Sequence, residues 1–421
     1  MDKIEILGGK PLVGKISISG AKNAALPILA ASLLTNSKLE LSNIPKLSDI
    51  NSMIRLLKSL NSHILNKSGK VIIKSRKPKH NFASYDLVRK MRASFLVLGP
   101  LLSRYGEAKV SLPGGCAIGA RPIDIHLTGF EKMGVNFEIK NGYVIGKVKK
   151  NLKGAKICLP FKSVGATENL LMAATLAEGK TIIVNAAQEP EIVDLGECLK
   201  LMGAKVHGLG TSKIIVNGVK KMTGCNYKIM PDRIEAGTYL LAVLGCSGWI
   251  ELDNLNNEVI QNLINTFDQF KDLDLVKKDD TSISVKFCKK TYDGISIKTS
   301  PFPGFPTDLQ AQLSAVMTRA KGISIIEESI FENRFMHVAE LQRMGASILI
   351  EGSKVIIKGK KKIFGAQLMA TDLRASSSLI IAGLMAEGKT IINRVYHLDR
   401  GYEKIEKKLS KCNVNIKRIK G

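Results

Sequence analysis

A pattern that recurs six times constrains the fold of this chain more than any other feature. Each copy has a polar start, a helix rich in Ala, Leu and Met, and then a β-branched strand. The copies cover residues 21–34, 87–106, 167–179, 234–248, 309–322 and 373–388. A glycine closes each of the last five copies, and these glycines lie about 66 to 74 residues apart. This spacing predicts six structural repeats along the whole chain.

A second helix follows the first in most repeats. The segments 130–134, 199–203 and 341–345 each end an amphipathic helix at a glycine and lead into a short strand. Residues 56–60 and 409–412 are weaker versions without the glycine. Each repeat therefore reads as a βαβαββ-type unit. Because the first helix is apolar nearly all round, we expect an α/β fold with the helices inside and the sheets outside.

The six repeats are expected to form two domains of three repeats each. A Gly-Cys-Asn-Tyr turn and a proline interrupt the pattern near residues 225–231. We therefore expect a first domain at 20–229 and a second at 1–19 and 230–421, although the pattern alone allows the first strand, within 1–19, to join either half. Two pseudo-symmetric halves predict a ligand site in a cleft between them, and their closure would exclude water.

Composition excludes several classes of protein. The 421 residues are 45% hydrophobic, enough for two or three folded domains, and no apolar stretch approaches the roughly 20 residues that span a bilayer. The start of the chain has no secretory pattern, so we expect a cytoplasmic protein that does not bind membranes. Seven scattered cysteines without CxxC pairs indicate reduced thiols and no zinc site.

The net charge of +26 is the feature most open to misreading. A basic surface can bind nucleic acid, but the lysines are dispersed, only 5% of the residues are aromatic, and no base-stacking motif is present. We therefore expect no specific nucleic-acid partner. The positive charge instead favours the capture of a small anionic substrate.

Cys116 lies in the glycine-rich stretch Ser111–His126. Gly114, Gly115 and Gly119 allow backbone conformations closed to other residues, so this thiol can be presented on a flexible loop. A turn with an incidental cysteine is the alternative, and the stretch alone does not decide between the two.

Other polar residues stand at the starts of the buried helices. Lys22 and Asn23 lie where a strand turns into a helix, a place that suits a bound anion, although composition alone favours a capped helix with a solvated lysine. Arg92 and Arg374 occupy the first turns of apolar helices, where an arginine is unfavourable unless it meets an anion. Asp308 follows a proline-rich entry to a helix and reads as a candidate N-cap. Arg400 lies in a polar loop that also reads as a plain surface turn.

Five motifs in order carry a resemblance over essentially the whole chain. They are Ser19–Pro27, Leu112–Pro122, Phe305–Asp308, Phe331–Phe335 and Asp399–Tyr402. Together they resemble the enolpyruvyl transferase family, in its branch that acts on UDP-N-acetylglucosamine. The resemblance implies an inside-out α/β barrel fold of two pseudo-threefold domains with six βαβαββ-type repeats.

The resemblance also implies a reaction. The enolpyruvyl group of phosphoenolpyruvate moves to the 3-hydroxyl of UDP-N-acetylglucosamine by addition and elimination, phosphate is released, and the product enters peptidoglycan synthesis. These two substrates are the implied partners, with no metal and no cofactor, and the protein is expected to be a monomer or weak homo-oligomer. The chemistry requires a proton donor, a base and cations that hold phosphate and carboxylate groups.

Roles follow by motif position. Cys116 resembles the proton donor, on a loop that resembles the family's lid, and Asp308 the base that takes the sugar hydroxyl proton. Positive charge near Cys116 would favour its thiolate. The resemblance implies that Arg374 binds the substrate carboxylate and that the phosphate is held by Lys22, Arg121 and Arg400.

The nucleotide-sugar contacts implied by the resemblance are Asn23, Arg92, Arg121, Pro122, Ile123, Asp124, Ile125, Ser163, Val164, Gly165 and Ile330. His397 lies beside Arg400 and is expected to support the site. The sequence departs from better-known family members in two places. Ser48 stands where they have a lysine, and Phe161-Lys162 precedes Ser163 where a lysine and a small apolar residue are more usual, which affects phosphate and nucleotide contacts.

Two other functions compete with this interpretation. A sister enzyme that acts on shikimate 3-phosphate would share the fold, but its motifs do not include the Gly-Gly-Cys stretch. A non-catalytic paralogue that binds nucleotide sugar is the second, and the presence of Lys22, Cys116, Arg121, Asp308 and Arg400 argues against it.

Overall fold

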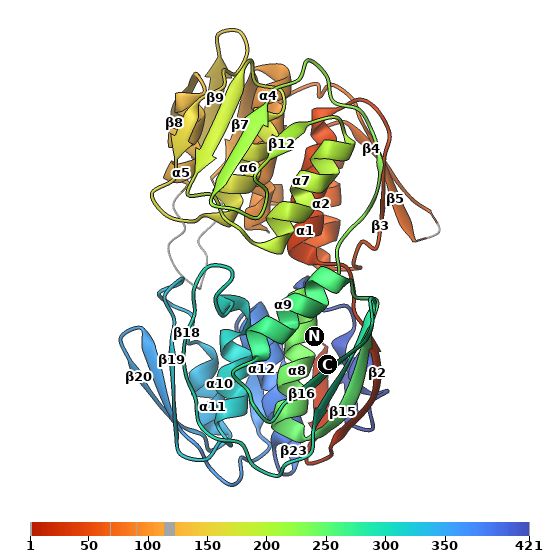
Figure 1. Ribbon diagram of the computed structural model, residues 1–421, viewed down its shortest axis with the longest axis vertical. Helices are drawn as coiled ribbons and strands as arrows, with labels where there is room; N and C mark the ends of the chain where they lie inside the picture. Colours follow the sequence, from red (N-terminus) through yellow and green to blue (C-terminus); the bar gives the residue numbers. More distant parts are fainter. Residues whose placement is uncertain (1, 68, 90, 113–122, 421) are drawn as a thin grey trace. The chain divides into compact units, whose positions relative to one another are not determined.

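The computed structural model describes residues 2–67, 69–89, 91–112 and 123–420 (Figure 1). Contacts between Cα atoms divide them into two compact units. Unit 1 contains the described residues of 2–19 and 231–420, and unit 2 contains those of 20–112 and 123–230. Cys116, Arg121 and Pro122 lie outside the described residues.

Six four-stranded sheets are found in the described part of the chain, three in each unit, and all share one topology. In one repeat of unit 2 the strands run in the order β10-β11-β13-β12. The first two are parallel and joined across a helix, while the last two form an antiparallel hairpin. A parallel pair requires such a crossover, and a hairpin does not, so this repeat contains both kinds of connection. The predicted βαβαββ-type repeat is confirmed.

Unit 2 contains three repeats. The first is β14 (Asn226–Lys228), α1 (Lys22–Ala31), η1 (Ser32–Leu34), β3 (Leu39–Ser42), α2 (Ser48–Ser59), β4 (Ser62–Lys67) and β5 (Lys70–Ser75). The second is β6 (Phe82–Ala83), α3 (Tyr85–Val88), η2 (Arg92–Val97), α4 (Leu98–Tyr105), β7 (Glu107–Ser111), α5 (Asp124–Lys132), β8 (Val135–Lys140) and β9 (Tyr143–Val148). The third is β10 (Lys156–Cys158), α6 (Val164–Ala174), β11 (Lys180–Val184), α7 (Pro190–Leu201), β12 (Lys205–His207) and β13 (Lys213–Asn217).

Unit 1 contains the other three. The fourth is β2 (Leu12–Ser17), α8 (Arg233–Cys246), β15 (Gly248–Asp253), α9 (Asn257–Phe267), β16 (Asp274–Asp279) and β17 (Ser282–Phe287). The fifth is β18 (Ser296–Lys298), η3 (Thr307–Leu309), α10 (Gln310–Met317), β19 (Ile323–Glu327), α11 (His337–Arg343), β20 (Ser347–Glu351) and β21 (Lys354–Lys358). The sixth is β22 (Gln367–Met369), α12 (Leu373–Met385), β23 (Lys389–Asn393), η4 (Val395–Arg400), α13 (Ile405–Leu409), β24 (Asn415–Ile419) and β1 (Lys3–Leu7).

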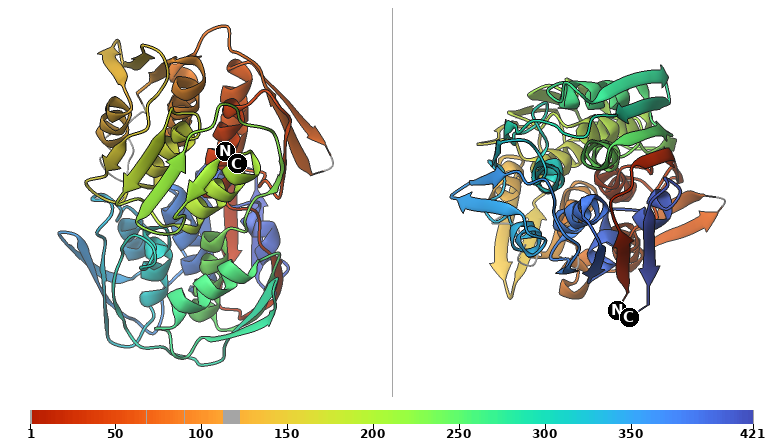
Figure 2. Two further views of the ribbon diagram at one scale, coloured as in Figure 1. Left: turned by 45° about the horizontal axis from the view of Figure 1, so that its top comes forward. Right: turned by 90° about the horizontal axis from the view of Figure 1, so that it is seen from below.

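The N-terminal segment forms two strands, not the one expected within residues 1–19. Strand β1 pairs with β24 and β23 and so completes the sixth repeat, while β2 pairs with β15 in the fourth. Figure 2 shows β1 and β24 side by side near the two chain ends. The glycine pair at 8–9 separates the two strands, and Gly9 adopts a φ of 86° that favours glycine.

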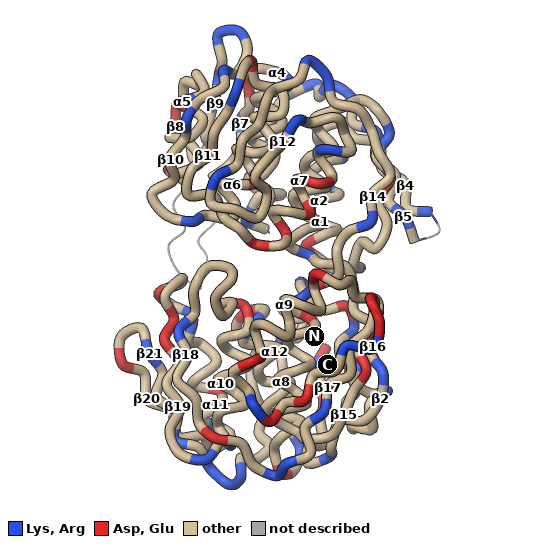
Figure 3. The backbone as a smooth tube through the Cα atoms, in the orientation of Figure 1, with Lys and Arg blue, Asp and Glu red and all other residues tan. Residues whose placement is uncertain are grey.

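The inner helices α1, α4, α6, α8, α10 and α12 are largely buried, as their apolar sequences predicted. In unit 1, α10 packs against both α8 and α12, and α12 is buried from Arg374 to Met385. In unit 2, α4 packs against α6. The sheets lie outside these helices in each unit (Figure 1). Lys and Arg residues are distributed over the strands and turns of both units (Figure 3).

Two sequence details resolve differently from expectation. The helix expected over 87–106 is divided into α3, η2 and α4. Pro100 lies in the first turn of α4, where its missing N–H costs no helical hydrogen bond, so the α-helix begins there. Two of the three repeats that lack the second glycine have Asn61 and Asn413 at φ values of 64° and 60°, because Asn also tolerates the left-handed region.

Among the residues that the structure describes, no helix is both long and apolar enough to cross a membrane.

Candidate functional site

A carboxylate held between two arginines is the most distinct polar arrangement in unit 1. Asp308 lies in η3, at the start of the inner helix of the fifth repeat. Its Oδ1 is 2.6 Å from Nη2 of Arg334, and its Oδ2 is 2.7 Å from Nη2 of Arg374. Both arginine side chains are 6% exposed, whereas that of Asp308 is 25% exposed. The carboxylate therefore retains access to solvent while both partners are buried.

The interpretation of Asp308 as an N-cap was wrong. Pro306 is the N-cap residue of η3, and no side chain caps this helix. Asp308 is instead drawn to the two guanidinium groups, whose charge-assisted hydrogen bonds are stronger than a neutral cap. Arg374 was expected to contact an anion, and in the structure it donates to the carboxylate of Asp308.

The charges of this cluster fix its protonation state. Burial raises the pKa of Asp308, but the charges of Arg374 and Arg334 outweigh it and hold that pKa well below its usual range. Burial lowers the pKa of Arg374, and the charge of Asp308 more than restores it, so that pKa lies above its usual range. Asp308 is thus ionised at neutral pH and can accept a proton.

Each arginine of the cluster is held by a second set of contacts. Nη1 of Arg374 donates to the hydroxyl of Tyr402 at 3.2 Å. Nη1 of Arg334 donates to Oγ1 of Thr307 at 2.7 Å, and that hydroxyl donates to Glu328 at 2.7 Å. The two guanidinium groups are therefore fixed in direction by neighbours as well as by Asp308.

Ile330 and Arg400, two further predicted site residues, also lie in unit 1. The backbone N–H of Ile330 donates to Oε1 of Glu328 at 2.8 Å, which connects this residue to the support of Arg334. Arg400 is the last residue of η4, and His397 lies in the same turn. Burial and the charge of Arg400 both lower the pKa of His397, so this imidazole is neutral at pH 7.

Lys22 and Asn23 begin α1 in unit 2. The N-cap position, Ala21, provides no side-chain hydrogen bond, and the first turn of the helix contains no acidic residue. Nζ of Lys22 lies 3.4 Å from Oδ2 of Asp49, in the first turn of α2. Both side chains are largely buried, with exposed fractions of 12% and 5%. Ser48, which stands where better-known family members have a lysine, is the first residue of α2 and directly precedes Asp49.

Arg92 begins η2 and lies near His126 of α5. Burial and the charge of Arg92 lower the pKa of His126 to about 3, so the imidazole is neutral. Its Nδ1 lies 3.2 Å from the amide nitrogen of Asn169, and its ring packs edge-on against Phe95. A neutral imidazole leaves the positive charge of this region on Arg92.

The remaining predicted residues of unit 2 lie at the starts of α5 and α6. Ile123 is the N-cap residue of α5, which begins at Asp124 and Ile125. Ser163 caps α6 by accepting from the N–H of Ala166 at 3.3 Å, and Val164 and Gly165 follow it. A Cβ on Gly165 would lie 3.5 Å from the ring of His126. The starts of these two helices are therefore adjacent.

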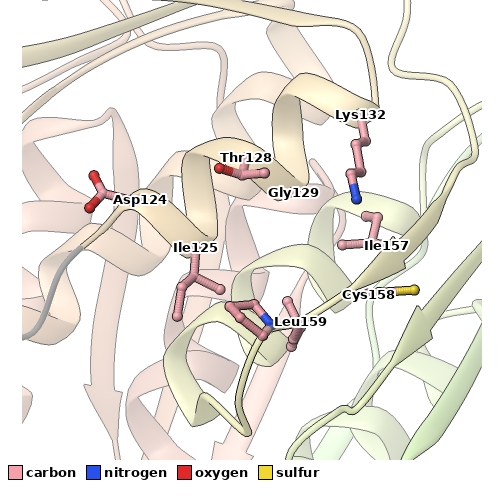
Figure 4. Close-up of a pocket in the computed structure, with 9 residues that line it drawn as sticks. Asp124, Ile125, Thr128, Gly129, Lys132, Ile157, Cys158 and Leu159 are labelled. Atoms are coloured by element: carbon pink, nitrogen blue, oxygen red, sulfur yellow. The ribbon is translucent and has the colours of Figure 1, made fainter.

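A shallow pocket of about 160 Å³ lies between α5 and strand β10. Figure 4 shows Asp124 and Ile125 on α5, with Cys158 and Leu159 on the facing strand and the residues after it. Phe161 and Lys162, which differ from the residues usual in the family, directly follow the residues that line this pocket. Phe161 is 54% exposed, and Nζ of Lys162 donates to Gln188 at 2.6 Å.

Sequence reasoning gave no role to several residues that contact a predicted site residue of their own unit. Arg334 was inside a quoted motif but was given no role, and Tyr402 closes another. Asp49 carried no signal except its place in a helix start. In the part of the chain that is described, no group of His, Cys, Asp and Glu side chains could hold a metal ion.

The profile of the EPSP synthase (3-phosphoshikimate 1-carboxyvinyltransferase) family matches residues 6–409. The chain belongs to this family of enolpyruvyl transferases, which confirms the resemblance found in the sequence.

Curated relatives define the branch. Proteins named UDP-N-acetylglucosamine 1-carboxyvinyltransferase from Paramagnetospirillum magneticum and Pelagibacter ubique are each 52% identical to this chain. These matches cover all of this chain and 99% and 100% of the relatives.

Solved structures confirm the fold. The enolpyruvyl transferase NikO from Streptomyces tendae has a TM-score of 0.87 at 20% identity, and covers 99% of this chain and 98% of its own. EPSP synthase from Acinetobacter baumannii has a TM-score of 0.78 at 18% identity, with both chains fully covered. The inside-out α/β architecture is therefore that of the enolpyruvyl transferases.

Proposed function

We propose that this protein transfers the enolpyruvyl group of phosphoenolpyruvate to the 3-hydroxyl of UDP-N-acetylglucosamine, with release of phosphate. The observation that carries the proposal is the 52% identity, over the whole chain, to relatives named for this reaction. The product is a precursor for peptidoglycan. The proposed location is the cytoplasm, and the proposed state is a monomer or weak homo-oligomer.

The reaction is an addition followed by an elimination. In the addition, the sugar 3-oxygen bonds to C2 of phosphoenolpyruvate, its proton passes to a base, and a proton is delivered to C3. In the elimination, the C2–O bond to phosphate breaks and C3 loses a proton, which restores the double bond. The enzyme must therefore supply a base, a proton donor and cations for two anionic groups.

Asp308 is the proposed base for the sugar hydroxyl. Its ionised state supports the role, but two arginine partners make a carboxylate a weak base. We expect the carboxylate of phosphoenolpyruvate to take Nη2 of Arg374 from Asp308. Loss of one cation would raise the pKa of Asp308, so the base would become stronger only when substrate is bound.

Lys22 and Arg92 are the proposed cations of unit 2. Each stands at the start of an inner helix without acidic residues in its first turn, where the helix dipole adds to the positive charge. We assign Lys22 to the phosphate of phosphoenolpyruvate, together with Arg121 and Arg400. Arg92 is assigned to the nucleotide sugar, with Asn23, Pro122, Ile123, Asp124, Ile125, Ser163, Val164, Gly165 and Ile330.

Cys116 is the proposed proton donor to C3. A thiol titrates closer to neutral pH than a hydroxyl does, and neighbouring cations favour proton exchange. Arg121 is five residues further along the chain and is the proposed cation beside it.

A phosphate-release assay tests the proposal. Purified protein is mixed with phosphoenolpyruvate and either UDP-N-acetylglucosamine or shikimate 3-phosphate. We expect phosphate only with the nucleotide sugar. Release with shikimate 3-phosphate would favour the alternative function, an enzyme that acts on shikimate 3-phosphate, which the name of the matching family supports. No release with either acceptor would favour a non-catalytic protein that binds nucleotide sugar.

A further inference from the structure

Tyr402 is a buried tyrosine to which the proposed reaction assigns no role. It follows η4 and is 1% exposed. Its hydroxyl lies 2.8 Å from Oγ1 of Thr238, 3.2 Å from Nε2 of Gln312 and 3.2 Å from Nη1 of Arg374. One phenol thus connects three inner helices of unit 1, namely α8, α10 and α12.

The direction of these hydrogen bonds follows from the donors available. The Thr238 hydroxyl has one proton and donates it to the carbonyl of Ile234 at 2.8 Å. Toward Tyr402 it can therefore only accept, so the phenol donates its own proton to Thr238. The lone pairs of the phenol then face Gln312 and Arg374, both of which are donors.

We propose that Tyr402 is a positioning residue that sets the direction of the Arg374 guanidinium and, through it, the placement of Asp308. The phenol accepts from Nη1 of Arg374, which leaves Nη2 for Asp308 at 2.7 Å. Guanidinium is planar, so a contact that fixes one nitrogen also fixes the other. The inference rests on the proposed function, in which Asp308 is the base and Arg374 the carboxylate ligand.

Charged and titratable groups of several elements surround the pair among the described residues, and they include His337 of α11, which interacts with Arg334 and Asp372. Arg334 and Arg374 face Asp308 directly, and the charges of Asp308 and Asp232 and the phenol of Tyr402 act on Arg374. Glu328 is connected to Arg334 through Thr307. Tyr402 is the neutral hydrogen-bond partner of Arg374 in this set.

The test is Tyr402→Phe, which removes only the hydroxyl. We expect kcat to fall about 10- to 100-fold and KM for phosphoenolpyruvate to rise, with little change in KM for the nucleotide sugar, because Arg374 is misdirected and the base with it. Since Arg374 would hold Asp308 less firmly, the acid limb of the pH profile of kcat/KM should move upward by about one pH unit.

Tyr239→Phe is the matched control. Tyr239 is also 1% exposed in unit 1, and its hydroxyl donates to Oε1 of Glu235 at 3.1 Å. It lies close enough to Tyr402 to interact electrostatically with it, but its hydroxyl makes no hydrogen bond to Arg374 or Asp308 among the described residues. It should lower stability in the same way and leave kcat and the pH profile as in the wild type. If Tyr402→Phe does not fold, Thr238→Val removes the acceptor of the phenol and should give the same shifts at smaller size.

The outcomes separate the two proposals. An active wild type in which Tyr402→Phe and Thr238→Val keep the wild-type kcat and pH profile would overturn the positioning role alone. A wild type without activity on UDP-N-acetylglucosamine would overturn the proposed function, and this inference with it.

Discussion

The two units build the same repeat but equip the starts of their inner helices differently. In unit 1 each start carries a carboxylate. Asp232 caps α8 and Asp372 caps α12, while Asp308 lies in η3 before α10. In unit 2 no acidic residue lies in the first turn of α1, η2 or α6, and Lys22 and Arg92 stand at two of these starts.

This difference divides the proposed chemistry. A helix start is a region of positive potential, which an aspartate neutralises and a lysine or arginine increases. In unit 1, Asp232 and Asp372 cap two of the helix starts, and Asp308 at the third is the proposed base. Unit 2 leaves positive potential for the phosphate groups of the substrates. In the proposed function, the base therefore belongs to unit 1, whereas the helix starts of unit 2 bind phosphate groups.

The largest effect on the rate is expected from Cys116, the proposed proton donor, which does not belong to any of these helix starts. Cys116→Ala should lower phosphate release by about 100-fold or more, because general acid catalysis typically contributes that factor. An epoxide of the fosfomycin type should inactivate the wild type and not the variant. Cys288→Ala, at an exposed cysteine of unit 1, is the control and should leave the rate unchanged. Equal rates in all three proteins would remove Cys116 from the mechanism.

Asp308→Asn tests the role given to unit 1. The isosteric amide cannot take the hydroxyl proton, so kcat should fall about 100-fold. The folded pKa of Asp308 is depressed, so its stabilising contribution is present above the unfolded value near 3.8 and is lost as pH falls through the folded value.

Urea unfolding measures the contribution of the Asp308 carboxylate to stability. The wild type should be more stable than Asp308→Asn at pH 7, and this advantage should shrink below about pH 4. An advantage that stays constant down to pH 2 would show that the ion pairs do not stabilise the fold.

Ser163→Asp makes a helix start of unit 2 resemble those of unit 1. Asp caps a helix as well as Ser, so the free energy of unfolding should stay within about 0.5 kcal/mol. The added charge should raise KM for UDP-N-acetylglucosamine about tenfold by opposing the diphosphate. Asn256→Asp, at the N-cap of α9 in unit 1, adds the same charge and should leave this KM unchanged. Equal effects of the two variants would contradict the division between units.

His126→Gln is expected to have the smallest effect on activity, and its main effect is on stability. The imidazole has a folded pKa of about 3 and an unfolded pKa near 6.5, so the unfolded state takes up a proton between these values. The wild type should therefore lose about 2.5 kcal/mol more stability than the variant between pH 7 and pH 4.5. The midpoints of urea unfolding at the two pH values measure this difference, and parallel curves would contradict a neutral His126.

The repeat, the inner helices and the outer sheets were predictable because periodicity and glycine spacing are local signals. The division of residues 87–106 was not, since it depends on Pro100 and on the hydrogen bond from Gly99 to Asn169 of another repeat. Lys22, Asp308 and Arg374 were noted at helix starts, but their roles were predicted from the family resemblance. Arg334 and Tyr402 were missed because their partners lie 26 and 28 or more residues away, and no local pattern predicts such pairs.

The most direct test of the account is a competition in one tube. The protein is given phosphoenolpyruvate with equal amounts of UDP-N-acetylglucosamine and shikimate 3-phosphate, and the products are identified by mass spectrometry and NMR. The account predicts one enolpyruvyl group on the 3-oxygen of the nucleotide sugar and unchanged shikimate 3-phosphate. Transfer to shikimate 3-phosphate, or to neither acceptor, would contradict it.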